Sequence, residues 1–232
     1  MLLKKWEDIP VFMRNEEVKK YYDRLNKKKF SLISKRLFDI VMSFLLCVLL
    51  SPIFLIIAIW IKLDSDGPIF YRQERVTQYG RIFKIFKFRT MIVNADKIGA
   101  LVTTHNDSRI TKVGEKIRKC RLDEIPQLFN ILLGDMSFVG TRPEVKKYVE
   151  KYVAHYTNEM KATLLLPAGV TSLASINYKN EDEIISKYIN ELSSIDEIYI
   201  KKILPEKMKY NLEYLKEFQV MKDVKLCVKT II

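Results

Sequence analysis

The sequence predicts an α+β protein that is mostly helical, with a helix–break–helix membrane segment ahead of a small cytosolic or interfacial domain. One uncharged apolar run, residues 40–61, is as long as the roughly 20 residues that cross a bilayer, and no second run of that length follows it. Beyond it, one strand–turn–strand pattern precedes several helix-like segments. We therefore divide the chain into a basic N-terminal extension (1–34), a membrane segment (35–63) and the remaining domain (64–232).

The composition fits one domain with a membrane appendage. Of the 232 residues, 48% are hydrophobic and 29% are charged, which excludes a disordered tail. Lys and Arg outnumber Asp and Glu by 40 to 28, and the net charge of +12 favours an anionic partner. Because no nucleic-acid-binding motif accompanies the charge, phosphorylated substrates beside an anionic membrane surface explain it better than nucleic acid does.

Cysteine and histidine restrict the chemistry. The three cysteines, Cys47, Cys120 and Cys227, are far apart and odd in number, which fits a reducing, cytosol-facing location. The only histidines, His105 and His155, give little material for a multi-histidine metal site or a histidine-based triad. Catalysis would therefore rest on carboxylates and cations.

The membrane segment contains a helix break at its midpoint. Pro52, after Ser51, lacks an amide hydrogen and crowds a carbonyl one turn back, so a helix should kink there. Lysines and arginines flank the segment on both sides, and the positive-inside tendency then favours cytoplasmic placement of both ends. A re-entrant hairpin satisfies both flanks, while a kinked transmembrane helix is an equal alternative from pattern alone.

The rest of the chain suggests one hairpin and several helices. Residues 69–76 and 81–88 read as strands around Gln78-Tyr79-Gly80, and residues 107–111 read as a loop. The run QLFNILL predicts a short helix that ends at Gly134. Residues 145–166 and 205–232 look like two further helices, lying along a membrane or facing the core, and residues 1–30 look partly helical.

Two adjacent acids, Asp123 and Glu124, stand between a basic segment and the apolar helix. Because Pro126 suits a first helical turn, Asp123 could cap the helix, with Glu124 a solvated surface acid. The alternative is functional, since a helix start attracts anions and two carboxylates can hold a divalent cation against phosphate oxygens. On local pattern alone the capping interpretation is the stronger one.

Cations near the acids make a phosphate or diphosphate site plausible. Arginine offers a planar fork that matches phosphate, and lysine adds a point charge. Taken singly, each such residue in so basic a chain reads as a solvated charge, and only the association with the two acids makes them candidates. The candidates are Lys87, Arg89, Arg109, Arg118 and Arg142.

From about residue 35 to the C-terminus, the chain resembles the bacterial sugar transferase family, whose small members are monotopic phosphoglycosyl transferases. The blocks that carry the resemblance appear in family order. They are KRLFDI, the Ser51-Pro52 break, GPIFYRQERV, FKIFKFRTM, NDSRITKVGEKIRK, RLDEIPQLFNILLGDMSFVGTRPE and LPEK.

The resemblance implies transfer of a sugar phosphate from a UDP-sugar to undecaprenyl or another polyprenyl phosphate, with release of UMP. Asp123 would be the nucleophile of a ping-pong reaction through an aspartyl phosphosugar, and Glu124 would act with Mg²⁺. Lys87, Arg118 and Arg142 match motif positions connected with phosphate. The hairpin would hold this site among membrane lipids, on the cytoplasmic face of the bacterial inner membrane.

Two departures limit the transfer of family properties. The usual GPRP block appears as Gly140-Thr141-Arg142-Pro143, and the usual PGITG block appears as AGVTS at residues 168–172. Sugar specificity and glycan pathway stay open, and so does a homo-oligomer. A non-catalytic, basic membrane scaffold for a glycan assembly complex is the competing hypothesis.

Overall fold

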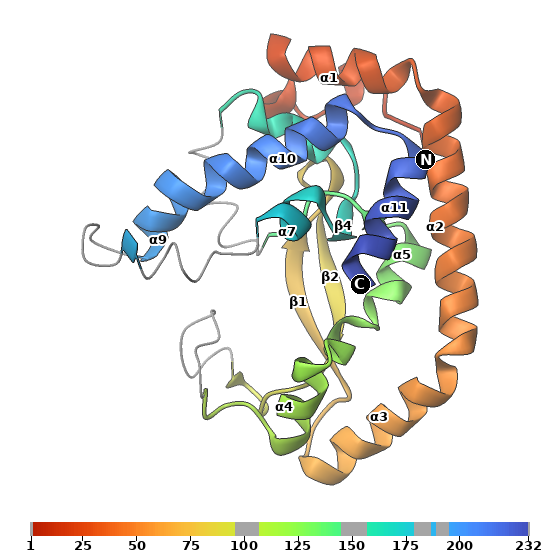
Figure 1. The fold of residues 1–232 in the computed structure, drawn as a ribbon, viewed down its shortest axis with the longest axis vertical. Coiled ribbons are helices and arrows are strands. Elements are labelled where there is room, and N and C mark those ends of the chain that lie inside the picture. The colour runs from red at the N-terminus through yellow and green to blue at the C-terminus, as the bar shows by residue number, and fades with distance from the viewer. Residues whose placement is uncertain (1, 96–106, 145–156, 179–186, 189–194, 232) are drawn as a thin grey trace.

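The structure is a computed structural model, and it describes residues 2–95, 107–144, 157–178, 187–188 and 195–231. A β-hairpin lies in the middle of the molecule, with helix α1 (Glu16–Asn26) across one end and helices α3 (Ser51–Asp64) and α4 (Lys112–Lys119) at the other (Figure 1). The described strands form two two-stranded sheets, so the predicted mostly helical α+β class is confirmed.

The apolar segment forms two helices that meet at the predicted break. Helix α2 (Lys29–Leu49) and α3 are bent by 60° relative to each other, and Pro52 lies in the first turn of α3. Within the described ranges no single helix has both the length and the apolar character to cross a bilayer, whereas the bent pair together does. Helix α2 begins ahead of the predicted boundary at residue 35.

The bent pair exposes most of its apolar side chains. Past Ser43, only Ile57 and Ile61 of its apolar residues are buried against the domain. Leu46, Cys47, Leu50 and Phe54 are half-buried against the domain. The exposed apolar surface of the pair comprises Phe44, Leu45, Val48, Leu49, Ile53, Leu55, Ile56, Ile59, Trp60 and Leu63. An exposed apolar surface of this extent is typical of contact with a membrane or another protein.

The β-hairpin predicted from residues 69–88 is confirmed. Strand β1 (Phe70–Val76) pairs with β2 (Ile82–Phe88) in antiparallel register, with Phe70 opposite Phe88. The connecting 3₁₀ turn η3 (Gln78–Gly80) places Tyr79 at φ 60° and Gly80 at φ 76°. The left-handed conformation costs glycine least, which is why the turn signal was readable from sequence.

The middle of the chain joins short helices to a second sheet. After α4 come the 3₁₀ turn η5 (Leu122–Glu124) and helix α5 (Gln127–Leu133), which ends at Gly134 as predicted, at φ 86°. Strand β3 (Met136–Val139) pairs in parallel with β4 (Ala168–Thr171), and helix α7 (Leu173–Asn177) follows. This parallel pair was not predicted.

In the second half of the chain, the structure differs from the two long helices that the sequence predicts. Residues 145–156 of the first expected helix lie outside the described part, and the described end of that stretch is helical only as a 3₁₀ helix, η6 (Met160–Leu165). The single helix expected over 205–232 is two helices, α10 (Leu204–Lys216) and α11 (Val220–Ile231), preceded by α9 (Ile195–Ile198) and the π-helical turn η7 (Tyr199–Ile203). Phe218 at the break is fully buried, and its carbonyl accepts a hydrogen bond from Lys28 Nζ at 2.7 Å.

The N-terminal segment is part of the core. Two 3₁₀ turns, η1 (Trp6–Asp8) and η2 (Val11–Met13), lead into α1, which Asn15 caps by accepting from the Val18 amide at 3.0 Å. Buried residues of this segment pack against η6 and α10. The "basic extension" therefore contributes apolar side chains to the main hydrophobic cluster.

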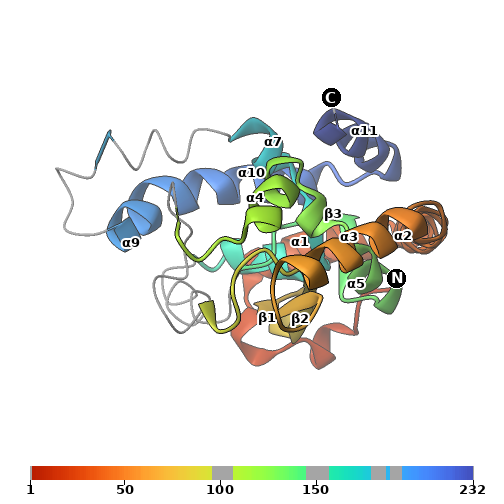
Figure 2. The same cartoon turned by 90° about the horizontal axis from the view of Figure 1, so that it is seen from below.

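Helix α2 is fastened to the domain at its N-terminal half. Lys35 forms a fully buried ion pair of 2.5 Å with Asp223 of α11. Arg36 donates to two carbonyls in the last turn of α5 at 2.6 and 2.9 Å, and Asp39 accepts from the Phe138 amide at 3.2 Å. Figure 2 shows the consequence, with α2 and α3 along one side of the molecule and α9 on the other.

Candidate active site

The two adjacent acids lie in η5, the turn between α4 and α5. Arg121, just before it, has φ 54° and ψ 22°, and this left-handed residue redirects the chain after α4. Helix α5 begins after Pro126, and no side chain caps it. The prediction that Asp123 caps this helix is therefore wrong, because the acids lie within the 3₁₀ turn and Ile125 and Pro126 separate them from the helix start.

Glu124 is held by two cations from distant parts of the chain. Its Oε1 accepts from Lys87 Nζ of β2 at 2.7 Å and from Arg142 Nη2 at 3.2 Å, and its side chain is 20% exposed. Burial on its own would raise the pKa of Glu124, but Arg142 and Lys87 outweigh it and lower the pKa to about 2. The interpretation of Glu124 as a solvated surface acid is wrong.

Asp123 has the opposite electrostatic environment. Burial raises its pKa above the ordinary value and the neighbouring Glu124 raises it further, while Lys87 and Arg118 act in the other direction. Two adjacent carboxylates whose pKa values are pushed apart are typical of sites where the acids have different roles. Glu124 is the more acidic member, and Asp123 is the more basic one.

Asp123 lines a cavity of about 650 Å³ beside the hairpin. Lys87 and Arg118 also line it, and Phe70 and Phe88 form part of its apolar wall. The volume is within the range of small-molecule sites, and a few charged groups in a partly apolar cavity provide the polarity that such a site needs. The remaining lining residues come from β1 and from residues 89–95, together with Pro68 and Arg109.

Two predicted phosphate-binding arginines have other partners. Arg89 is buried, and its terminal nitrogens donate at 2.6 Å to the carbonyls of Ser65 and Asp66 after α3. Arg109 pairs with Asp107 through two hydrogen bonds of 2.9 and 2.6 Å and also donates to the Ala95 carbonyl. Both line the cavity, but these contacts fix loops, so direct phosphate binding by either residue stays a prediction.

Arg142 is placed by the unpredicted parallel strands. Gly140 and Gly169 lie face to face, and a Cβ on Gly140 would meet the Pro167 carbonyl oxygen at 2.4 Å. This close approach lets the Gly169 amide donate to the Thr141 carbonyl at 2.9 Å, one residue before Arg142. Both blocks that differ from the family pattern, GTRP and AGVTS, keep their glycine, Gly140 and Gly169. The close packing of the two strands explains why, because neither position has room for a side chain.

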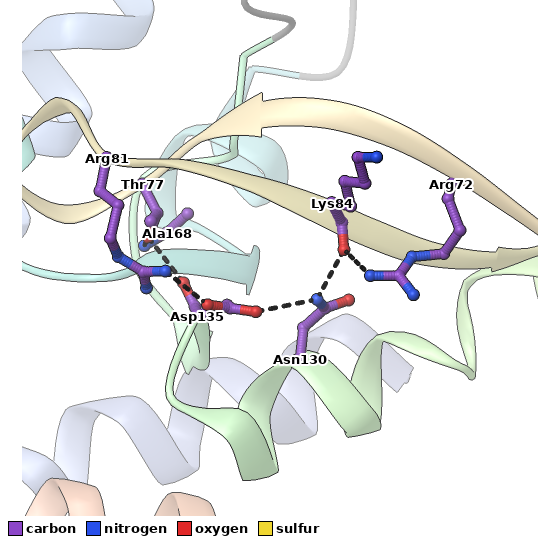
Figure 3. Close-up of polar contacts among 7 residues, drawn as sticks. All are labelled: Arg72, Thr77, Arg81, Lys84, Asn130, Asp135 and Ala168. Carbon is purple, nitrogen blue, oxygen red and sulfur yellow. Dashed lines mark hydrogen bonds and ion pairs between the residues drawn. The ribbon is translucent and has the colours of Figure 1, made fainter.

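A polar network holds the hairpin against α5 and β4 (Figure 3). Asn130 donates to the Lys84 carbonyl at 3.0 Å. Its side chain also accepts from the Phe86 amide at 2.8 Å, which fixes the strand just before Lys87. The Asp135 carboxylate accepts from Arg81 at 2.8 Å. Its carbonyl accepts from the Thr77 hydroxyl at 2.6 Å, and that hydroxyl in turn accepts from the Ala168 amide.

Two cations near the site were not singled out from the sequence, although each lies in a family block. Arg75, in GPIFYRQERV, lines the cavity and contacts the segment that carries Arg142. Lys207, in LPEK, lies by Arg142 and Glu144, and burial lowers its pKa. The signal that could have identified them is a charged residue inside an otherwise ordered motif, which in so basic a chain does not stand out.

The donor set at the dyad fits a magnesium ion shared with a substrate. Mg²⁺ in phosphate chemistry is held by one or two carboxylates together with substrate phosphates. Asp123 supplies a carboxylate that lines the cavity, Glu124 follows it in the same turn, and both cation contacts of Glu124 go to a single oxygen, Oε1. Across the described ranges there is no group of three or more metal-ligating His, Cys, Asp or Glu side chains, so an all-protein cage is absent from that part.

A carboxylate pair among cations, beside an exposed apolar helix pair, is an arrangement suited to phosphate chemistry at a membrane surface. The model of the family described as "Bacterial sugar transferase" matches residues 30–232. The chain belongs to the bacterial sugar transferase family. The resemblance inferred from the sequence blocks is thus confirmed.

Individual relatives transfer different sugars. The chain is 36% identical over 204 residues to a UDP-glucose:undecaprenyl-phosphate glucose-1-phosphate transferase of Klebsiella pneumoniae, covering 87% of this chain and 40% of the relative. It is 35% identical over 197 residues to a UDP-N-acetylgalactosamine-undecaprenyl-phosphate N-acetylgalactosaminephosphotransferase of Aeromonas hydrophila, covering 85% and 42%. It is 37% identical over 170 residues to an undecaprenyl-phosphate galactose phosphotransferase of Salmonella typhimurium, covering 66% and 34%.

The chain spans about two fifths of the length of the first of these curated relatives. Their names agree on undecaprenyl phosphate and differ in the sugar. Family membership therefore leaves the identity of the sugar open.

Proposed function

We propose that this protein is a phosphoglycosyl transferase that moves a sugar 1-phosphate from a UDP-sugar to undecaprenyl or another polyprenyl phosphate. The observation that carries the proposal is the dyad, in which Asp123 lines a cavity with Lys87 and Arg118 while Glu124 stays ionised beside it. The names of the relatives support the substrate class. The reaction would be the first membrane step of a bacterial surface glycan or glycoconjugate.

Asp123 is the proposed nucleophile. Its carboxylate oxygen attacks the sugar-bearing phosphorus and forms a P–O bond, while the bond from that phosphorus to the bridging oxygen of the diphosphate breaks, so that UMP leaves with the bridging oxygen. The phosphate oxygen of the polyprenyl phosphate then attacks the same phosphorus and displaces the aspartate. A pKa raised by burial suits this role, because a more basic carboxylate is a better nucleophile in its ionised form.

The cations lower the repulsion between a carboxylate and an anionic diphosphate. Lys87 and Arg118 both act electrostatically on Asp123, so they are placed to bind phosphate oxygens approaching it. Arg142, which follows Glu124 in the chain, also contacts it. The Arg142 side chain is half exposed, so it can contact substrate as well. Mg²⁺ bound by Asp123 and Glu124 would supply further charge neutralisation at the same oxygens.

The bent helix pair is the proposed membrane anchor. We propose that α2 and α3 enter and leave the cytoplasmic face of the plasma membrane as a re-entrant hairpin, with Ser51 and Pro52 at the break. The exposed apolar surface of both helices and the basic flanks support this placement. Labelling of single cysteines near residues 20 and 75 tests it, because labelling from opposite sides of the membrane would exclude a hairpin.

The function is tested with a panel of UDP-sugars and polyprenyl phosphate in membranes, scored for Mg²⁺-dependent UMP release. Asp123→Asn should abolish release and also abolish a covalent sugar-phosphate adduct on the protein, detected by mass spectrometry. Asp23→Asn is the matched control, because Asp23 is an exposed aspartate of α1 that forms an ion pair with Lys19 one turn away on the same helix. Wild-type turnover in Asp123→Asn would refute the nucleophile, and a wild-type protein inactive with every UDP-sugar would favour the scaffold hypothesis.

A further inference from the structure

Arg75 stands out among the cations near the site because it lines the cavity and also binds the backbone of the segment that carries Arg142. It occupies the penultimate position of β1, and burial lowers its pKa, with Glu144 acting in the opposite direction. Its Nε is buried with no hydrogen-bond partner within the described part of the chain. Keeping a permanent charge in such a place is costly, so the contacts that the residue makes there need a reason.

Those contacts hold the segment that carries Arg142. Arg75 Nη1 donates to the Pro143 carbonyl at 3.0 Å, and its Nη2 donates to Gln73 Oε1 at 2.6 Å. The next residue of the strand, Val76, donates its amide to the Glu144 carbonyl at 3.0 Å. The end of β1 therefore binds two consecutive carbonyls immediately after Arg142.

The same segment is bound from its other side by β4. The Gly169 amide donates to the Thr141 carbonyl at 2.9 Å, immediately before Arg142. The backbone of residues 141–144 is thus held between two strands from separate sheets. Arg142 lies at the middle of this segment, and its side chain reaches Glu124 Oε1 at 3.2 Å.

We propose that Arg75 is a positioning residue, which holds residues 141–144 so that Arg142 stays directed at Glu124. The inference rests on the proposed function for its catalytic consequence, although the geometric part of it stands independently. Arginine suits the position because its planar fork supplies two fixed donors, one for Pro143 and one for Gln73, whereas lysine would supply one flexible point charge.

A double-mutant cycle on turnover tests the catalytic part. Displacement of a catalytic contact by about 1 Å costs on the order of 100-fold in rate, so Arg75→Gln should lower kcat by about that factor while KM changes far less. Because Arg75 acts through Arg142, Arg75→Gln combined with Arg142→Gln should be no slower than Arg142→Gln alone. Multiplied losses in the double variant would overturn the proposal.

Amide hydrogen exchange supplies a readout that does not need activity. In Arg75→Gln, the amides of Val76 and Gly169 should exchange at least about tenfold faster, because both donate to the released segment. The Phe86 amide, which donates to Asn130, should keep its wild-type rate and shows that the hairpin is intact. Unchanged exchange at Val76 and Gly169 would refute the proposal.

Two further variants keep the result interpretable. Arg75→Lys retains the charge and most of the volume, so it should fold even if Arg75→Gln fails to fold. Its turnover and its amide exchange rates should lie between those of the wild type and those of Arg75→Gln. Arg14→Gln is the control for loss of one positive charge, because Arg14 is exposed in the N-terminal segment.

If wild-type protein releases no UMP, the proposed function fails, and hydrogen exchange alone decides the positioning role. If exchange rises while turnover is unchanged, the function stands and the positioning role fails.

Discussion

Replacing Lys87 with methionine tests whether this lysine holds Glu124 ionised in the folded protein. The cations lower the pKa of Glu124 from 4.5 to about 2, which at about 1.4 kcal/mol per pKa unit corresponds to roughly 3 kcal/mol. Arg142 shares that stabilisation, so loss of Lys87 alone should cost about 1.5–2 kcal/mol. For a chain of this length the midpoint of thermal unfolding should fall by about 3–8 °C.

The pH dependence of that loss follows from the direction of the shift. Because the folded-state pKa is lowered, the stabilisation is complete above pH 4.5 and is lost as the pH falls toward 2. The difference between wild type and Lys87→Met should therefore be full at pH 7 and smaller at pH 3.5. Thermal unfolding of both proteins in the same lipid nanodiscs at the two pH values measures it.

Lys84→Met is the matched control, because Lys84 lies on the same strand with an exposed side chain and only its backbone joins the polar network. The control should unfold like the wild type. A Lys87→Met protein with unchanged stability at pH 7 would refute the reasoning, since it would show that the 2.7 Å contact with Glu124 contributes nothing to folding.

Two more outcomes are expected. Turnover should fall on acidification through a pKa above the ordinary aspartate value of about 3.9, because burial raises the pKa of Asp123 and only its ionised form attacks phosphorus. In Lys87→Met this acid limb should move to higher pH, and a pH–rate profile in which it stays in place would contradict the assignment. Gly140→Ala should destabilise the protein by about 1–3 kcal/mol in denaturant unfolding, because the added Cβ meets the Pro167 carbonyl oxygen at 2.4 Å. An unchanged unfolding midpoint would contradict the close packing of these two segments.

The features that sequence predicted correctly depend on local chemistry. Gln78-Tyr79-Gly80 specifies a tight turn, Gly134 ends α5, and Pro52 marks the start of α3. Each signal is complete within a few residues, so no knowledge of distant segments was needed.

The features that sequence missed depend on distant segments. Strands β3 and β4 are four residues each, and the pairing of Met136 with Ala168 spans a long intervening stretch, so no local pattern indicates it. Likewise, the local sequence predicts a surface acid at Glu124, because its partners Lys87 and Arg142 are distant in the chain and only the fold brings them to it.

The candidate cations show the same limit. Lys87 and Arg89 are two residues apart and looked equivalent in sequence, yet Lys87 reaches Glu124 while Arg89 binds the carbonyls that follow α3. The prediction for the dyad relied on ordered family blocks rather than on the acids themselves. What the structure adds is the reason that two identical functional groups acquire different acidities.

The attachment of α2 to the domain has a mechanical consequence. Arg36 donates to the end of α5 and Asp39 accepts from β3, so the helix proposed to enter the bilayer is bound directly to the elements next to the dyad. A helix in a bilayer of different thickness responds by changing its tilt. Through these contacts and the buried pair of Lys35 with Asp223, that tilt would turn Asp123 relative to the lipid headgroups, so bilayer thickness would set the angle at which a lipid phosphate meets the proposed nucleophile.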